Sequence, residues 1–253
     1  MADAALFLAG VYGVTWALCL LVRGDLLAWL LPTVWSPTAL ALILAARTGG
    51  SAAVKHELGH LVWRRGLGLW IFLACAFPAA ATITALLIAR SAGDAAPFTT
   101  IRAIPSMVAL QLATGALGEE LGWRGFLLPR FQQRMPKPAA ACSMAVLWSL
   151  WHVAGMFFPG TPLQIVPAGW FLLNAACFGI FLAFLFDRAG ESVLAPMAAH
   201  LALNVSLGVG GVRPSSVTFW KALAGMYGIA ALSGAVGLRT PAAPFRNALR
   251  RSS

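Results

Sequence analysis

Apolar runs of about twenty residues recur along the whole chain, and short polar stretches separate them. Eight such runs can be drawn, at residues 4–22, 26–46, 69–90, 103–130, 138–158, 163–186, 192–211 and 217–238. Because a helix rises about 1.5 Å per residue, each run is long enough to cross the hydrocarbon core of a bilayer. The pattern therefore predicts an all-α, polytopic membrane protein of about eight transmembrane helices, with residues 1–253 forming a single membrane domain.

Composition agrees with this prediction, and the charge needs a separate explanation. Of the 253 residues, 60% are hydrophobic and 10% are charged, whereas about a quarter of the residues of soluble proteins are charged. The formal net charge is +10, which in a soluble protein would suggest nucleic acid as a partner. The loops and helix ends on one side of the predicted bundle hold 12 basic residues, however, and those on the other side hold 5.

This uneven distribution predicts the orientation of the chain in the membrane. By the positive-inside rule, the side with more basic residues lies in the cytoplasm. That side includes both termini, the loop at 47–68 and a basic cytosolic tail at 239–253. The charge therefore reflects topology, and the expected partner is the lipid bilayer, with no nucleic acid. Small apolar helices and a basic cytosolic face predict a multi-pass protein of a bacterial inner membrane.

The loop between the second and third runs contains the sequence KHELGH, in which His56, Glu57 and His60 fit the pattern H-E-x-x-H. Two histidines four residues apart share one helix face and can hold zinc, while the glutamate serves as a general base. A zinc site also needs a third ligand, and the chain lacks the third histidine of the longer H-E-x-x-H-x-x-G-x-x-H motif. Residues 52–65 are better explained as an amphipathic helix on the membrane surface, with His56 and His60 on its polar face.

Three charged residues interrupt the fourth apolar run. An ionised side chain at the centre of a membrane helix costs about 2.5–3.5 kcal/mol, so Glu119, Glu120 and Arg124 are expected to face the protein interior. Glu120 and Arg124 lie four residues apart and can form an ion pair on one helix face. Glu119 points about 100° away and has no partner within its own helix. It is the carboxylate left free for chemistry, unless all three residues only hold helices together.

Two histidines and an asparagine lie in later runs, and each alone could serve only in helix packing. The fifth run contains His152, and the seventh contains His200 and Asn204 at i and i+4. At about 1.5 Å per residue, these residues and Glu119 all lie roughly 12–21 Å from the cytosolic ends of their helices. We therefore expect one polar site near the middle of the membrane.

Such a site has the parts that hydrolysis requires. A glutamate beside a histidine can hold a water molecule and accept its proton, which produces a nucleophile. A histidine and an asparagine on one helix face can donate hydrogen bonds to an oxyanion. Attack of water on an amide carbonyl needs both functions, so peptide hydrolysis within the membrane is a chemical possibility.

The stretch E-E-L-G-W-R-G-F-L-L-P-R, followed by W-x-x-x-H and then H-x-x-x-N, resembles the CPBP (Abi, or CAAX-protease-like) family of intramembrane proteases. That family's patterns are E-E-x-x-x-R, an aromatic-x-x-x-H and H-x-x-x-N, in this order on separate helices. They match here at Glu119, Glu120 and Arg124, then at Trp148 and His152, then at His200 and Asn204. The resemblance covers about residues 103–206, a CPBP-like catalytic core, with Ala154 where many relatives have proline.

The resemblance implies an intramembrane endopeptidase in which Glu119 activates water together with His152. His200 and Asn204 would stabilise the oxyanion, and Glu120, Arg124 and Trp148 would support the site. Members of the family have been described both as metalloproteases and as metal-free glutamate proteases. Because the matched residues supply a base and oxyanion donors without an ion, we expect no cofactor. The expected partner is a peptide or membrane-protein substrate.

Two other hypotheses stay open at this point. One is a catalytically silent membrane scaffold or an immunity-type protein, since some relatives act in bacteriocin immunity or as partners. Unused polar groups are costly to keep in a membrane, which argues against this hypothesis. The other is a zinc metalloprotease that uses His56, Glu57 and His60.

Overall fold

The computed structural model describes residues 2–22, 24–94, 102 and 104–240, and these residues form helices and loops without any strand. The long helices are α1 (Ala2–Leu21), α2 (Leu26–Leu58), α3 (Leu67–Ser91), α7 (Lys137–Trp151), α9 (Ala168–Arg188), α10 (Leu194–Val209) and α11 (Val217–Gly237). Shorter helical pieces are η1 (Gly59–Leu61), α4 (Ile104–Gln111), η3 (Leu112–Ala116), α5 (Leu117–Glu120), η4 (Leu121–Leu127), α6 (Leu128–Gln132), α8 (Val153–Phe157) and η5 (Pro162–Ile165).

Six helices of the described chain are long and apolar enough to cross a membrane: α1, α2 with η1, α3, α7 with α8, α9 and α11. The prediction of an all-α, multi-pass membrane protein is confirmed. The count of eight is not confirmed by length and composition. The fourth predicted run is divided into α4, η3, α5, η4 and α6, and α10 has only 16 residues.

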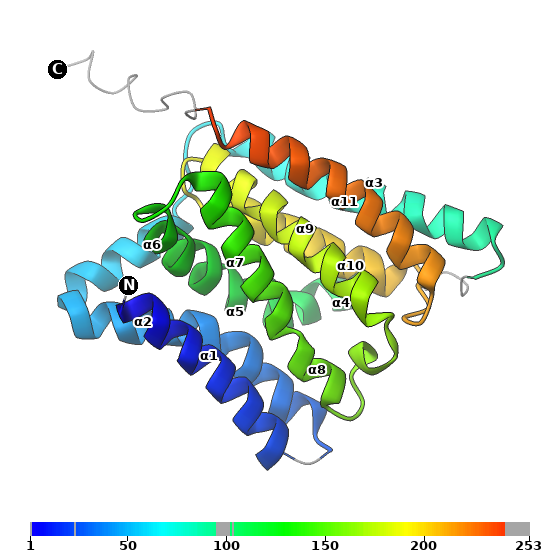
Figure 1. The fold of residues 1–253 in the computed structure, drawn as a ribbon, viewed down its shortest axis with the longest axis horizontal. Helices are drawn as coiled ribbons and strands as arrows, with labels where there is room; N and C mark the ends of the chain where they lie inside the picture. Colours follow the sequence, from blue (N-terminus) through cyan, green and yellow to red (C-terminus); the bar gives the residue numbers. More distant parts are fainter. Residues whose placement is uncertain (1, 23, 95–101, 103, 241–253) are drawn as a thin grey trace.

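The helices form a bundle in which segments distant in sequence lie side by side. Helices α1 and α2 form one edge of the bundle, and α3 and α11 form the opposite edge (Figure 1). Helix α9 packs against both α7 and α11, and α10 packs against α3 and α9. Two polar contacts tie α1 to α7, since the Tyr12 hydroxyl donates to the Leu147 carbonyl (2.6 Å) and the Trp151 indole donates to Thr15 (2.8 Å).

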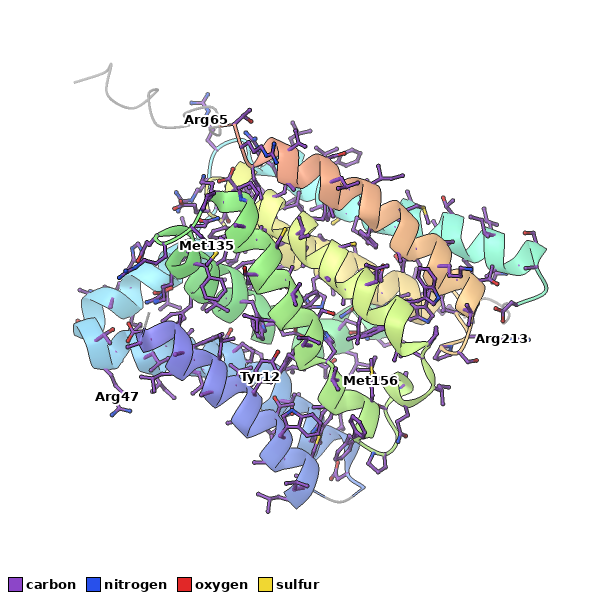
Figure 2. The ribbon with its side chains drawn as sticks, in the orientation of Figure 1. Tyr12, Arg47, Arg65, Met135, Met156 and Arg213 are labelled. Atoms are coloured by element: carbon purple, nitrogen blue, oxygen red, sulfur yellow. The ribbon has the colours of Figure 1, made fainter. Side chains whose placement is uncertain are left out.

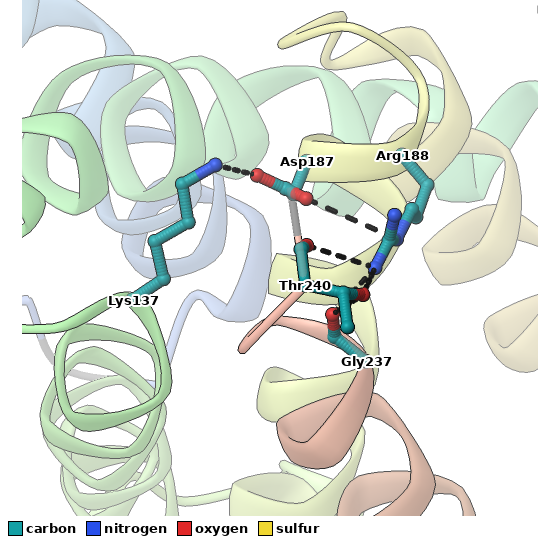
Figure 3. A network of polar contacts seen from close by, with 5 residues as sticks. All are labelled: Lys137, Asp187, Arg188, Gly237 and Thr240. Atoms are coloured by element: carbon teal, nitrogen blue, oxygen red, sulfur yellow. Dashed lines mark hydrogen bonds and ion pairs between the residues drawn. The ribbon is translucent and has the colours of Figure 1, made fainter. Parts of the chain in front are cut away.

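Charged side chains lie at both ends of the bundle. Figure 2 shows Arg47 and Arg65 at one end of the molecule, and Met156 and Arg213 at the other. At the end with Arg65, Lys137 at the start of α7 pairs with Asp187 near the end of α9 (Figure 3). The neighbouring Arg188 donates to the Gly237 carbonyl and to the Thr240 hydroxyl beyond α11. These contacts join three helix ends. The predicted tail at 239–253 lies outside the described residues from position 241 onward.

The helix predicted at 52–65 differs from what the structure shows. Helix α2 continues to Leu58 after a break at Gly50, whose φ of 61° is a conformation that glycine adopts without steric cost. The helix then tightens into η1 and ends before Val62, which is extended. His60 was predicted on the polar, exposed face, and this prediction is wrong: its side chain is buried, because it packs against Phe186 and bonds to the Glu191 carbonyl.

Two glycines allow the segment that carries Glu119 and Glu120 to lie directly on the backbone of α2. A Cβ atom at Gly118 would lie 2.4 Å from the Val34 carbonyl oxygen, and one at Gly122 would lie 2.4 Å from the Pro37 carbonyl oxygen. This i, i+4 spacing of small residues is a common way for membrane helices to pack closely. Pro37 leaves the Thr33 carbonyl without its helical donor, and the Ser36 hydroxyl donates to it instead (2.8 Å).

We predict that Gly118→Ala and Gly122→Ala each lower the free energy of unfolding by about 1–3 kcal/mol, because the added methyl group meets rigid backbone. Thermal unfolding of the detergent-solubilised protein measures this effect. The matched control is Gly225→Ala in α11, where an added Cβ meets nothing within 4 Å. That change is expected to leave stability equal or slightly higher, since alanine favours a helix over glycine. Equal melting temperatures for all three variants would contradict the close packing.

Candidate active site

The two glutamates lie on a helix that is distorted on both sides of them. Helix α5 is only four residues long and lies between two π-helical segments, η3 and η4. Within η3, Thr114 and Gly115 have non-helical dihedral angles, and the Trp35 indole of α2 donates to the Ala113 carbonyl at the break (2.8 Å). Because π-helical turns occur frequently at functional sites, this distortion marks α5 as the centre of a candidate site.

Glu120 is the hub of a buried charge network. Its Oε1 atom accepts a hydrogen bond from Arg124 Nη1 at 3.0 Å and another from His200 Nδ1 at 2.8 Å. The side chains of Glu120 and Arg124 are fully buried, and His200 is almost so. The predicted ion pair between Glu120 and Arg124 is confirmed. The bond from Glu120 to His200 on α10 was not predicted, and it joins the two helices on which most of the candidate residues lie.

Glu119 takes its partner from another helix. The indole Nε1 of Trp148 on α7 donates to Glu119 Oε2 at 2.8 Å. Glu119 is 4% exposed, so this hydrogen bond is made away from bulk water. Sequence reasoning expected no partner for Glu119 within its own helix and assigned Trp148 only a supporting place. The signal that could have identified the donor is the W-x-x-x-H spacing, which puts Trp148 and His152 on one helix face.

Trp148 also orients both histidines and the arginine. The ring of His152 lies 4.8 Å from the Trp148 ring, and the ring of His200 lies 5.5 Å from it, both edge to face. The Arg124 guanidinium lies 4.4 Å from the centre of the Trp148 ring, within the range of a cation–π interaction. One tryptophan therefore contacts four of the residues that the sequence selected, including Glu119.

His152 lies where α7 ends, and its ring orientation is fixed by its own helix. Its Nδ1 atom lies 2.8 Å from the Trp148 carbonyl oxygen. A carbonyl oxygen can only accept, so Nδ1 carries the proton of this hydrogen bond. In the neutral ring, Nε2 then keeps its lone pair and can accept a proton or hold a water molecule.

Asn204 lies one turn after His200 on α10, beside the break in the neighbouring helix. A Cβ atom at Gly115 would lie 3.1 Å from Asn204 Nδ2, so the absence of a side chain at Gly115 makes room for this amide. Among the described residues, the amide makes no hydrogen bond, and it is available to another partner. The structure thus gathers Glu119, Glu120, Trp148, His152 and His200 into direct contacts, with Asn204 along the same helix as His200.

The alternative metal ligands lie elsewhere. The rings of His56 and His60 are 5.5 Å apart near the end of α2, and the Nδ1 atom of His60 is held by the Glu191 carbonyl at 2.7 Å. Over the ranges that the structure describes, no group of three or more His, Cys, Asp and Glu side chains is arranged to hold a metal ion. The zinc hypothesis therefore gains no third ligand from these residues.

Comparison with known proteins identifies the class. Residues 101–206 match the model of the family described as type II CAAX prenyl endopeptidase Rce1-like. The chain is also 24% identical, over 194 residues, to the CAAX prenyl protease 2 of Methanococcus maripaludis, a match that covers 70% of each chain. The protein is thus a multi-pass membrane endopeptidase, which is a peptide hydrolase. Both matches are consistent with the CPBP, or CAAX-protease-like, family that the motifs resemble.

We predict that Arg124→Met lowers the free energy of unfolding by about 3–5 kcal/mol, because it leaves the Glu120 carboxylate buried without its cation. The double variant with Glu120→Gln is expected to recover part of this loss, since it removes the unpaired charge as well. Denaturant titration of the single and double variants measures the difference. The Glu120→Gln change could lower the free energy of unfolding equally in the wild type and in Arg124→Met. That result would show that the two residues are not coupled.

Proposed function

We propose that this endopeptidase cleaves peptide bonds at the level of Glu119, within the membrane, by direct attack of water. The observation that carries the proposal is the position of Trp148, which holds the Glu119 carboxylate through its indole and the His152 ring through its carbonyl. These contacts engage Glu119 Oε2 and His152 Nδ1. Glu119 Oε1 and His152 Nε2 are left as acceptors for a water molecule.

In the proposed reaction, water is held between Glu119 and His152 Nε2 and loses a proton to Glu119 as its oxygen attacks the carbonyl carbon. The proton on Glu119 then passes to the amine nitrogen when the carbon–nitrogen bond breaks, so the glutamate is regenerated. The burial of Glu119 favours this role, because little bulk water competes for the carboxylate.

The negative charge that develops on the carbonyl oxygen needs donors on the opposite side, and we assign these to His200 and Asn204. The Nδ1 atom of His200 is engaged by Glu120, so donation to an oxyanion comes from Nε2. Donation from both ring nitrogens requires the imidazolium, which the Glu120 carboxylate stabilises. The Asn204 amide, one helical turn away, supplies the second donor. A base and two oxyanion donors complete the reaction, so we propose that it proceeds without a metal ion.

The substrate we propose is a peptide segment of a membrane protein. The family description and the name of the methanococcal relative refer to prenylated CAAX proteins as the substrates of those proteins. For a protein of a bacterial inner membrane, unprenylated segments are the expected class. A suitable assay therefore offers quenched fluorescent peptides with and without a farnesyl group.

We predict that Glu119→Gln lowers kcat by a factor of about a thousand or more, since the general base and proton carrier is lost. Asn204→Ala is expected to lower kcat by about 10²–10³-fold with little change in KM, as for the loss of one oxyanion donor. Cleavage of the peptide set by purified variants in detergent measures both effects.

His56→Ala and a zinc chelator serve as the controls in this assay, and neither is expected to change the rate. Loss of cleavage with His56→Ala and with the chelator, together with full activity of Glu119→Gln, would show that HELGH is the catalytic motif. Absence of cleavage by the wild type, with a partner still bound, would instead support a silent scaffold.

We also propose that the end of the bundle with Arg47 and Arg65, and both chain termini, face the cytoplasm. The excess of basic residues at that end supports this orientation. In a cysteine-free background, Arg65→Cys is expected to react with a membrane-impermeant maleimide only after the cells are broken. Ile165→Cys, in η5 between α8 and α9, is expected to react in intact cells. The opposite labelling pattern would reverse the orientation.

A further inference from the structure

We infer that Glu57 and His60 of the HELGH motif are positioning residues. They hold the continuous segment α5–η4–α6, which carries Glu119 and Glu120, in register with α10, which carries His200 and Asn204, at the cytosolic ends of both. The inference rests on the proposed function, because it names residues that act through Glu119, Glu120 and His200. Glu57 and His60 lie about 60 residues before Glu119 in the sequence, yet they bond to the segment that follows Glu119 and to the turn that begins α10.

Glu57 holds the helix that follows the catalytic glutamates. Its Oε1 atom accepts from both Nη1 and Nη2 of Arg130 on α6, each at 3.1 Å. Glu57 is 3% exposed, so this pair is shielded from water more than a surface ion pair. Arg130 also donates to the Phe126 carbonyl in η4 (2.8 Å), which ties the guanidinium to the π-helical segment itself. The end of α2 is thereby attached to the continuous segment that carries Glu119.

His60 holds the start of the other catalytic helix. Its Nδ1 atom donates to the Glu191 carbonyl at 2.7 Å, and its own carbonyl accepts from Val193 N at 2.9 Å. Glu191 has a φ of 64°, a strained conformation for a residue other than glycine, and this pair of hydrogen bonds stabilises it. Helix α10, with His200 and Asn204, begins directly after this turn.

The His60 side chain also lies between the two attached segments. His60 Cδ2 lies against Gly125 of η4, so the same imidazole separates η4 from the turn that begins α10. Deeper in the membrane, Glu120 and His200 join the same two helices at 2.8 Å. A shift of α10 along its axis would move His200 and Asn204 together relative to Glu119. Since a misplacement of about 1 Å can lower a rate a hundredfold, the register of these helices bears directly on kcat.

His56 provides an internal comparison within the same motif. It is exposed and lines a cavity of about 310 Å³ together with Asp3, Glu57, Gly125, Pro129, Arg130, Gln133 and Arg134. No hydrogen bond joins its ring to another residue of the described chain. A zinc site would require His56 and His60 equally, whereas the positioning role requires His60 and not His56. The two histidines of one motif therefore distinguish the two roles.

The experiment compares His60→Ala, His60→Asn and His56→Ala in the peptide cleavage assay. His60→Ala is expected to lower kcat about 10- to 100-fold with KM nearly unchanged, because positioning and not binding is lost. His60→Asn is expected to recover most of kcat, since the asparagine amide N–H can donate to the Glu191 carbonyl in place of Nδ1–H. His56→Ala is expected to equal the wild type. Equal kcat for His60→Ala and the wild type, or failure of asparagine to rescue, would overturn the inference.

A second measurement separates this inference from the proposed function. Hydrogen–deuterium exchange of the backbone amides in the first turns of α10 is expected to be faster in His60→Ala and normal in His60→Asn, at equal global melting temperatures. If Glu119→Gln remains active, the proposed mechanism fails, and the exchange result still decides whether His60 holds α10. Unchanged exchange in His60→Ala overturns the inference whatever the activity of Glu119→Gln.

Discussion

A single carboxylate oxygen, Oε1 of Glu120, joins the two halves of the site by accepting from both Arg124 and His200. A lone charge in the bilayer interior is costly, so each member of this network is stable only while the others are in place. The contact fixes α10 beside α5 at the depth of Glu119. Trp148 of α7 then contacts residues of both segments that this network joins, Glu119 and Arg124 on one side and His200 on the other.

The catalytic segment is irregular because its surroundings determine its path. The backbone of α2 at Val34 and Pro37 fits against Gly118 and Gly122, and the π-helical segments on both sides rotate the intervening residues. Neighbouring side chains on a helix diverge by about 100°, so Glu119 reaches Trp148 and Glu120 reaches His200, although the two glutamates are adjacent in the chain. The contacts of Gly118 and Gly122 with α2 fix the rotation of the segment about its axis, and this rotation selects the partners.

The sequence predicted the fold class, because hydropathy depends on local sequence alone. The Glu120–Arg124 ion pair could also be predicted from the sequence, since an i, i+4 contact lies within one helix. The hydrogen bond from Trp148 to Glu119 could not be predicted, because it depends on how α7 is rotated against α5. The number of spanning helices was uncertain for a related reason: proline, glycine and π-turns divide the fourth run, and apolar length gives no sign of such breaks.

The HELGH stretch illustrates how one spacing can serve two structural purposes. Positions i and i+4 share a face, and a shared face can hold a metal ion or can lie along a neighbouring element. Here the tightening of α2 into η1 turns His60 inward to Glu191, while His56 stays exposed. The glutamate between them turns toward Arg130, where a zinc enzyme would need it to face water. The same residues that suggested a separate catalytic centre thus fit better as a support of the centre around Glu119, and the motif belongs to the protease by its contacts and not by its pattern.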